Sequence, residues 1–568
     1  MPTPRVSPLS LLALLLPSVL YGCLSPRQNE TGPVTASPGP SSPPASSPTA
    51  PSPVAFRDVT SAAGLNYRWP RPTKRPLNIL QTIGYGCAFL DYDRDDRLDI
   101  LLIGPRPAIY RGDGKGRFSD VTAALRLDDT QADFRGCAVG DYDNDGFPDL
   151  YISGFRTGLL FRNEEGKRFR NVTPTSGMTP QPWGGACAWG DINGDGLLDL
   201  YVGNYVRFGP DAPQLCATNG IMTACTPHGY APEKGVLYLN QGNGRFREAT
   251  KDWGAHTVSG KTLGVAFADF DNSGRQHLAL ANDGVPGDLL VNRQGKFENI
   301  GDTAGTAYGP AGKPYAGMGL DWGDFDNDGK IDLMVTAYAR EDKPLYRNEG
   351  DGLFSEVSQT MGLVAPTSPD VAFGVKWLDF DNDGWLDLAL ANGHTSDNIA
   401  DINPELTYRQ PTRFFRNEKG QRFADLGESI REEARRPIVG RGLATGDYDN
   451  DGRIDLLIVD GEGPPLLLHN ETTDGGNYLT LRLVGKKRHR DAYGAVVTVR
   501  IGNTTRTRIC HADGSFFSSS DPRVHFGLGK DTGRTVAVTV RWAGGLTETW
   551  PTVAVNTRHT LTEGDGKP

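Results

Sequence analysis

Short apolar segments and short acidic segments alternate along most of the chain. Small and apolar residues such as 136–140 (GCAVG) precede nine Asp-rich residues, and β-rich runs such as 199–202 (DLYV) follow such segments. Runs of this length and composition are typical of strands, whereas Asn, Asp and Gly are typical of turns. Each acidic segment therefore predicts a loop that joins two strands.

Two further strands follow each acidic loop. The third ends in an Asn-Gly type turn, as in residues 345–350, and the fourth begins with Phe, as in residues 354–357. Repeats of about 50 residues with four strands each predict an all-β fold, a seven-bladed β-propeller over residues 54–470. The acidic segments begin at Asp91, Asp141, Asp191, Asp269, Asp324, Asp379 and Asp447.

The Phe-led strands are displaced by one element relative to the acidic loops. The first Phe-led strand lies before all seven acidic loops, and no Phe-led strand follows the last acidic loop. We therefore expect residues 54–60 to form the outer strand of the last blade, which closes the ring and removes an edge that invites aggregation. These strands begin at Phe56, Phe118, Phe169, Phe246, Phe297, Phe354 and Phe423.

The composition agrees with many turns and places the negative charge in the loops. The 568 residues include 71 Gly and 40 Pro, which argues against helical bundles. The net charge of -10 argues against a nucleic-acid partner. The acidic segments contain 26 Asp and 5 Lys or Arg, which leaves 43 acidic and 54 basic residues elsewhere. All of the excess acidity therefore belongs to the loops.

The acidic segments have the spacing of calcium loops. In residues 141–149 (DYDNDGFPD), carboxylates occupy positions 1, 3, 5 and 9, Gly at position 6 permits a sharp turn, and the carbonyl of position 7 adds an oxygen. Ca²⁺ accepts irregular oxygen shells, Zn²⁺ prefers His or Cys, and carboxylates this close repel one another without a cation. The alternative is ordinary hairpin chemistry.

We expect five or six Ca²⁺ sites. Their predicted ligands are Asp91, Asp93, Asp95, Arg97, Asp99, Asp141, Asp143, Asp145, Phe147, Asp149, Asp191, Asn193, Asp195, Leu197, Asp199, Asp324, Asp326, Asp328, Lys330, Asp332, Asp379, Asp381, Asp383, Trp385, Asp387, Asp447, Asp449, Asp451, Arg453 and Asp455.

The acidic segments are not equal. The first has Asp96 where Gly belongs, which makes its turn costlier. The fourth, residues 269–277, has lost two carboxylates and ends in His277. We expect the fourth to bind weakly or stay empty, so loss of Asp145 should harm the protein more than loss of Asp271.

The N-terminal residues predict export. Arg5 precedes an apolar stretch, residues 9–21, that is too short to span a bilayer, and residues 20–23 (LYGC) resemble a bacterial lipobox. We expect a signal peptide over residues 1–22, lipidation of Cys23, and anchoring at an outer membrane, cell surface or periplasm. Residues 23–53, rich in Pro and Ser, form a tether. Ordinary secretion is the alternative.

The other cysteines suggest two roles. Cys87, Cys137 and Cys187 lie four residues before the first Asp of their loops, where other repeats carry Val or Leu, so core packing is favoured over a metal ring or disulfides among them. Cys216 and Cys225 bracket a short loop in a long insertion, and export permits a disulfide between them.

The repeats resemble the FG-GAP or VCBS repeats of integrin α-subunit propellers. Residues 474–565 resemble the ASPIC and UnbV domain, most clearly at 514–518 (GSFFS) and 523–529 (RVHFGLG). The combination resembles the cartilage acidic protein family, including its bacterial lipoprotein members, over residues 54–565. This resemblance implies a Ca²⁺-binding extracytoplasmic propeller with a C-terminal β-sandwich, and it implies no defined catalytic site.

A partner is expected on one face of the ring. Strands in a blade alternate in direction, so both long insertions, residues 204–236 and 392–413, lie opposite the acidic loops. Because extra ordered chain costs entropy, we expect this face to bind an unidentified protein or glycan, with Asn392, His394 and Tyr408 to be tested first. The alternative is that the insertions only shield the channel mouth.

The leading hypothesis is a monomeric binding or adhesion module. The sequence has no Gly-x-Ser-x-Gly, no His-Glu-x-x-His and no phosphate-binding Gly loop. The alternatives are a propeller enzyme that acts on polysaccharide or uses a cofactor in its axial pocket, and a purely structural envelope component.

Overall fold

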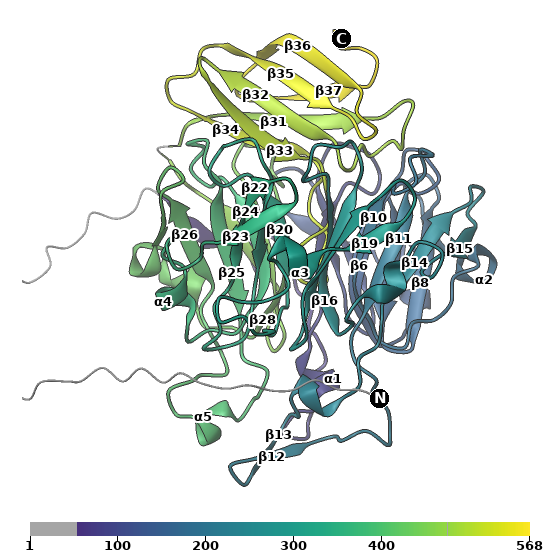
Figure 1. Ribbon diagram of the computed structural model, residues 1–568, viewed down its shortest axis with the longest axis vertical. Coiled ribbons are helices and arrows are strands. Elements are labelled where there is room, and N and C mark those ends of the chain that lie inside the picture. Colours follow the sequence, from purple (N-terminus) through teal and green to yellow (C-terminus); the bar gives the residue numbers. More distant parts are fainter. Residues whose placement is uncertain (1–53, 474) are drawn as a thin grey trace, which may run out of the picture. The chain divides into compact units, whose positions relative to one another are not determined.

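The computed structural model describes residues 54–473 and 475–568. The predicted signal peptide, Cys23 and the tether lie outside the described residues. Within residues 54–470, seven four-stranded antiparallel sheets follow one another, and we number them sheets 1 to 7 in the order of their acidic loops (Figure 1).

Each sheet begins with the strand that precedes its acidic loop. Sheet 1 comprises β2 (Cys87–Leu90), β3 (Asp99–Leu102), β4 (Ala108–Gly112) and β5 (Phe118–Asp120). Sheet 2 comprises β6 (Phe134–Gly140), β7 (Asp149–Gly154), β8 (Thr157–Asn163) and β9 (Phe169–Asn171). Sheet 3 comprises β10 (Gly184–Gly190), β11 (Asp199–Asn204), β14 (Val236–Asn240) and β15 (Phe246–Glu248). Sheet 4 comprises β16 (Thr262–Ala268), β17 (His277–Asn282), β18 (Asp288–Asn292) and β19 (Phe297–Asn299).

The remaining sheets repeat this order until the last one. Sheet 5 comprises β20 (Leu320–Gly323), β21 (Asp332–Val335), β22 (Leu345–Gly350) and β23 (Leu353–Glu356). Sheet 6 comprises β24 (Ala372–Leu378), β25 (Asp387–Asn392), β26 (Arg413–Asn417) and β27 (Phe423–Asp425). Sheet 7 comprises β28 (Gly440–Gly446), β29 (Asp455–Asp460), β30 (Leu466–Asn470) and, from the start of the folded chain, β1 (Phe56–Asp58).

The ring closes through β1. Phe56 pairs with Asn470 and Asp58 with Leu468 in an antiparallel register. The first strands touch their neighbours in a cycle from β2 through β6, β10, β16, β20, β24 and β28 back to β2. The predicted all-β propeller and its closure by residues 54–60 are therefore confirmed.

Aromatic residues at position 2 of the acidic loops join neighbouring sheets. Tyr142 stacks on Trp189 with ring centroids 6.1 Å apart and meets Phe246 at 5.5 Å, and both partners belong to sheet 3.

Cys87 and Cys137 are free and completely buried, in agreement with the core interpretation.

The long insertions carry short elements on the side of the ring opposite the acidic loops (Figure 1). The first contains β12 (Cys216–Thr218), β13 (Ile221–Thr223) and the predicted Cys216–Cys225 disulfide, which is confirmed. The second contains α5 (Ile399–Ile402). The two insertions touch, because the Thr223 hydroxyl donates to Asn398 Oδ1 at 2.8 Å and the Asn398 amide donates to the carbonyl of Met222 at 2.9 Å.

The remaining helices are single turns. The α-helical turns are α1 (Ile79–Thr82), α2 (Thr173–Ser176), α3 (Gly301–Ala304) and α4 (Val364–Thr367). The 3₁₀ turns are Leu127–Asp129, Pro227–Gly229, Ala255–Thr257, Gly427–Ser429 and Glu432–Arg435. Across the described ranges, no helix is long and apolar enough to cross a membrane.

The C-terminal residues form two further sheets (Figure 1). One contains β34 (Val524–Gly529), β31 (Asn477–Val484) and β37 (Thr557–Thr562), with β31 and β37 parallel. The other contains β33 (Thr504–Ile509), β32 (Val496–Ile501), β35 (Thr535–Arg541) and β36 (Thr547–Ala554). Buried residues of both sheets, among them Leu481, Val499, Phe526 and Val538, share one core, as in a β-sandwich.

Candidate metal centres and the closed pore

Each acidic loop is built by its own carboxylates. In loop 2, the amide of Gly146 donates to Asp141 Oδ2 at 2.7 Å and the amide of Phe147 donates to Asp145 Oδ1 at 2.9 Å. Asp149, at position 9, accepts the amide of Tyr142 at 3.2 Å and that of Asn163 in the third strand at 2.7 Å. These bonds fold the loop so that its carboxylates converge.

The predicted ligands do come together. Oxygens of Asp141, Asp143 and Asp149 lie within 4.8 Å of one another, and the same holds for positions 1, 3 and 9 of the loops at Asp91 and Asp324. Several loop oxygens are buried and have no hydrogen-bond partner among the described residues, namely Asp93 Oδ1, Asp141 Oδ1, Asp324 Oδ1, Asp381 Oδ1 and Asp449 Oδ1. Oxygens buried without donors fit a cation, because burial without a partner is costly.

The electrostatics of the loops point in the same direction. Burial raises the pKa of Asp324 to about 7, and the charges of Asp326 and Asp328 add to the rise. Burial likewise raises the pKa of Asp99 to about 8 and that of Asp447 to about 7. Carboxylates that resist ionisation next to one another are stabilised in the charged form by a bound cation.

Arginines of the third strands are site residues that the sequence analysis missed. Arg162 contacts Asp143 at 2.7 Å and Asp145 at 3.2 Å. Arg111 of β4 makes the same contacts in loop 1, to Asp93 at 2.7 Å and Asp95 at 3.1 Å. The signal was present, because an aromatic residue followed by Arg recurs at the end of four third strands, at residues 110–111, 161–162, 346–347 and 415–416.

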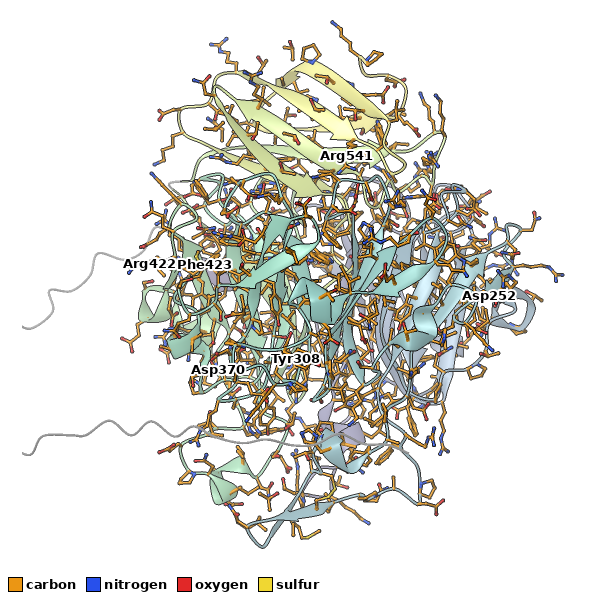
Figure 2. The ribbon with its side chains drawn as sticks, viewed as in Figure 1. Asp252, Tyr308, Asp370, Arg422, Phe423 and Arg541 are labelled. Atoms are coloured by element: carbon orange, nitrogen blue, oxygen red, sulfur yellow. A yellow bond between two sulfur atoms is a disulfide. The ribbon has the colours of Figure 1, made fainter. Side chains whose placement is uncertain are left out.

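In the fourth loop, side chains of Arg541 and His277 contact the carboxylates. Arg541 of β35, labelled in Figure 2, forms an ion pair with Asp269 and donates to Asn272 Oδ1 at 2.6 Å. His277 Nδ1 accepts the amide of Asn292 at 3.0 Å, so its Nε2 carries the proton and donates to Asp271 at 2.8 Å. Burial acts to raise the pKa of Asp271, but the hydrogen bond from His277 holds that pKa below its ordinary value. This gives a physical reason for the expected weakness of the loop.

An asparagine at the end of the third strand links neighbouring sheets. Asn240 Nδ2 donates to the carbonyl of Tyr142 in the preceding loop at 2.9 Å and to that of Leu198 in its own loop at 3.1 Å. The sequence predicts only a turn at this asparagine, whereas in the structure its side chain also links two neighbouring sheets. The same bond to the preceding sheet is made by Asn163, Asn292, Asn348, Asn417 and Asn470.

Residues 513–520 of the C-terminal region, the C-terminal plug, enter the pore from the acidic-loop side. Ser515 pairs with Leu320 of β20 through two backbone hydrogen bonds, of 2.6 and 3.3 Å. The amide of Cys137 in β6 donates to the carbonyl of Phe517 at 3.1 Å, and the amide of Ser519 donates to the carbonyl of Cys87 in β2 at 3.0 Å. The plug therefore fills the centre of the ring, where its backbone forms hydrogen bonds with the first strands of sheets 1, 2 and 5.

Small residues of the first strands make room for the plug. A Cβ at Gly86 would lie 1.8 Å from the carbonyl oxygen of Phe517, and one at Gly442 would lie 2.5 Å from Ser518 Oγ. Glycine stands immediately before the equivalent core residue in six of the seven sheets. The small and apolar runs before the acidic loops thus form the inner wall of a pore that the C-terminal plug fills.

Basic residues of the C-terminal sheets contact the acidic loops. Arg482 contacts Asp96 at 2.9 Å, and Arg523 donates to Asn450 Oδ1 at 2.6 Å and to the carbonyl of Asp447 at 2.9 Å. The acidic-loop face is therefore covered by cationic side chains of the same chain.

The residues predicted to bind a partner lie beneath the opposite surface. Asn392 and His394 are completely buried, and Tyr408 is half-buried with its hydroxyl 3.0 Å from Glu462. His394 Nδ1 accepts the amide of Ser396 at 2.9 Å, and burial together with Arg441 lowers the pKa of His394 to about 4. Asn392 and His394 therefore shape the insertion, and partner binding at this face stays a prediction.

Comparison with known proteins agrees with this architecture. Residues 485–568 match the ASPIC and UnbV family model, and residues 91–152, 141–202 and 324–390 match the FG-GAP-like repeat. Cartilage acidic protein 1 from Homo sapiens is 26% identical over 60% of this chain and 47% of that protein. The protein of that name from Xenopus tropicalis is 25% identical over 53% of this chain and 43% of its own length. The chain spans about half the length of these relatives.

Solved structures give weaker likenesses. An Agrocybe aegerita lectin, described as recognising non-reducing terminal N-acetylglucosamine, is 14% identical with a TM-score of 0.40 over 68% of this chain and 95% of that one. YCF48 from Cyanidioschyzon merolae is 12% identical with a TM-score of 0.38 over 71% of this chain and 97% of that one. The chain thus joins FG-GAP-like repeats to an ASPIC and UnbV region and is similar to cartilage acidic protein 1, as the resemblance seen in the sequence predicts.

Proposed function

We propose that the chain is a calcium-binding, exported propeller lipoprotein that acts as a binding or adhesion module for a protein or glycan. The observation that carries this proposal is the set of buried carboxylate oxygens without hydrogen-bond partners in the acidic loops. A bound Ca²⁺ supplies the positive charge that such oxygens need. Five or six loops hold the ion, and in the fourth Arg541 pairs with Asp269 while His277 donates to Asp271.

The distribution of loops supports binding at the face opposite the acidic loops. The C-terminal residues occupy the acidic-loop face and the pore, so the long insertions are the extended loops left open to a partner. Met222, in strand β13 of the disulfide-containing insertion, is 48% exposed. A large exposed apolar side chain on a hairpin held by a disulfide suits a protein or glycan contact.

A thermal-shift screen of the calcium-loaded chain against glycans and envelope proteins tests the binding function. The substitution M222D should reduce the shift caused by a true partner, because it places a charge in the contact. L546D is the matched control, since Leu546 is also an exposed apolar residue, 41% exposed, on the C-terminal sheets. A partner whose effect is abolished equally by both variants would contradict the assignment of the face.

Anchoring through Cys23 is tested separately. The substitution C23S should give a soluble or uncleaved product, because the thioether to the lipid cannot form. Membrane association that survives this substitution would overturn lipidation while leaving the calcium proposal intact.

A further inference from the structure

A blind pocket lies at the centre of the ring, beneath the long insertions. Its volume is about 830 Å³, including space open to solvent. Leu263, Met318 and Phe373, at the first strands of sheets 4 to 6, line its inner part. Phe373 packs on Phe516 of the C-terminal plug, with ring centroids 4.9 Å apart. The plug thus closes one end of the pore and leaves a pocket at the other.

The rim of the pocket comes from separate parts of the chain. Ile79 and Thr82 of α1 line it, as do Cys225 and His228 of the disulfide-containing insertion. The wall is mostly apolar, as in pockets that hold small organic molecules.

Two carboxylates from different sheets line the same pocket. Asp283 follows β17 and is 5% exposed; its Oδ2 accepts the Tyr205 hydroxyl at 2.6 Å, and across the described residues no donor contacts its Oδ1. Glu341 follows β21, and its Oε2 accepts the amides of Ala316 at 2.9 Å and Tyr338 at 3.3 Å. A carboxylate oxygen that lines a cavity without a donor from the protein is free to accept a hydrogen bond from a ligand or from water.

Two basic side chains close to the pocket donate to backbone carbonyls. Lys261 acts on Asp283 through space, and its ammonium donates to the carbonyl of Pro227 at 2.8 Å. Arg441 lies 4.0 Å from the Phe373 ring, and its guanidinium donates to four backbone carbonyls. Neither Lys261 nor Arg441 is among the residues that line the pocket, so the carboxylates of Asp283 and Glu341 are the charged groups at its wall.

We propose that this pocket binds a small organic cation, an ammonium group carried on an apolar body. The ammonium group would donate to Asp283 Oδ1 with Glu341 adding negative charge, and the apolar body would lie against Met318 and Phe373. This site goes beyond the proposed function. It requires only that the ring is folded and that the C-terminal plug is in place.

Proton linkage gives the site a signature. Burial raises the pKa of Asp283 to about 7, and the charge of Glu341 adds to this while Tyr205 and Lys261 oppose it. His228 and the Tyr338 hydroxyl also border the pocket. A bound ammonium group favours the ionised carboxylate, so the affinity should rise about tenfold between pH 6 and pH 8.

Isothermal titration of the full, calcium-loaded chain with 2-phenylethylamine tests the proposal. The neutral isostere 2-phenylethanol should bind at least about tenfold more weakly, because it has the same apolar body without the charge. The substitution D283N should weaken amine binding by a similar factor. E405Q is the control, since Glu405 is an exposed carboxylate of the second insertion outside the pocket.

The comparison of amine and alcohol needs no variant, so a folding defect in D283N leaves the test valid. Equal binding of amine and alcohol, or absence of binding by the amine, overturns the pocket proposal, as does wild-type affinity in a folded D283N protein. The calcium content measured on the same samples reports the proposed function independently.

Discussion

Asp149 and its counterparts at position 9 bind the backbone as well as being proposed calcium ligands. Both oxygens of Asp149 accept amides, one from its own loop and one from the third strand. In the fourth sheet His277 takes over the second of these bonds, which shows that the position is needed for folding even where the other ligands are lost. Asp141 and Asp145 also accept loop amides at 2.7 and 2.9 Å, whereas Asp143 at position 3 accepts one only at 3.3 Å. Substitution at position 3 should therefore report calcium binding most directly.

Position 3 offers a matched pair for this test. The substitution D143N removes one anionic ligand beside Arg162, so the chain should lose one bound Ca²⁺ and part of its calcium-dependent rise in melting temperature. D271N alters the same position of the fourth loop, where the carboxylate is held by His277, and should leave the calcium content unchanged. Elemental analysis that finds the same calcium content in both variants would contradict the loop assignment.

Arg541 should stabilise the protein without any role in calcium binding. The substitution R541M leaves the buried carboxylate of Asp269, with a side chain 2% exposed, without its partner. Breaking a buried pair in this way should cost roughly 2 to 4 kcal/mol in the free energy of unfolding. The double variant R541M/D269N should recover much of this loss in denaturant titrations. A single variant as stable as wild type would show that the pair contributes nothing.

At the scale of elements, the repeat was predictable and the plug was not. Alternating apolar runs, acidic loops and Phe-led strands predicted the sheets and the pairing of residues 54–60 with the end of the ring, because these features are local and recur. The insertion of residues 513–520 depends on contacts with strands hundreds of residues away, which no local pattern reveals. The same limit hid Arg541 and the role of Asn240, although recurring Gly, Arg and Asn positions carried a signal.

The plug predicts a specific sensitivity at Gly86. The substitution G86V places side-chain atoms where the carbonyl of Phe517 lies, so the C-terminal plug should be displaced and the melting temperature should fall. Limited proteolysis should then cut the C-terminal region faster than in wild type. G229A is the control, because nothing lies within 4 Å of a Cβ there. Equal protease resistance of G86V and wild type would contradict plug docking at the first strand of sheet 1.

At the scale of the whole molecule, charge balance joins the two parts of the fold. The loops concentrate the acidity of the chain, and arginines of the C-terminal sheets contact them from above the ring. Carboxylates such as Asp324 and Asp326 still repel one another, and in the proposed calcium-bound form the ion relieves this repulsion. Stability should therefore depend on both pH and calcium, and the two should be linked.

The linkage has a definite sign. The pKa of Asp99 is raised to about 8 and that of Asp324 to about 7 in the folded chain, so the metal-free fold holds protons that the unfolded chain releases above about pH 4. The melting temperature in EDTA should therefore fall as the pH rises from 5 to 8. With excess Ca²⁺ this fall should disappear, because the ion stabilises the charged form. An EDTA-treated protein that gains stability over this range would contradict the linkage.

The most direct test of the central claim is the melting temperature of the full chain with Ca²⁺ and with EDTA, together with its calcium content by elemental analysis. A site held at a hundred times its Kd contributes about 2.7 kcal/mol. Five or six such sites should therefore raise the melting temperature by about 10 °C or more. We predict five or six bound Ca²⁺ per chain and a large fall in melting temperature on chelation. An unchanged melting temperature in a protein without bound calcium would contradict the account.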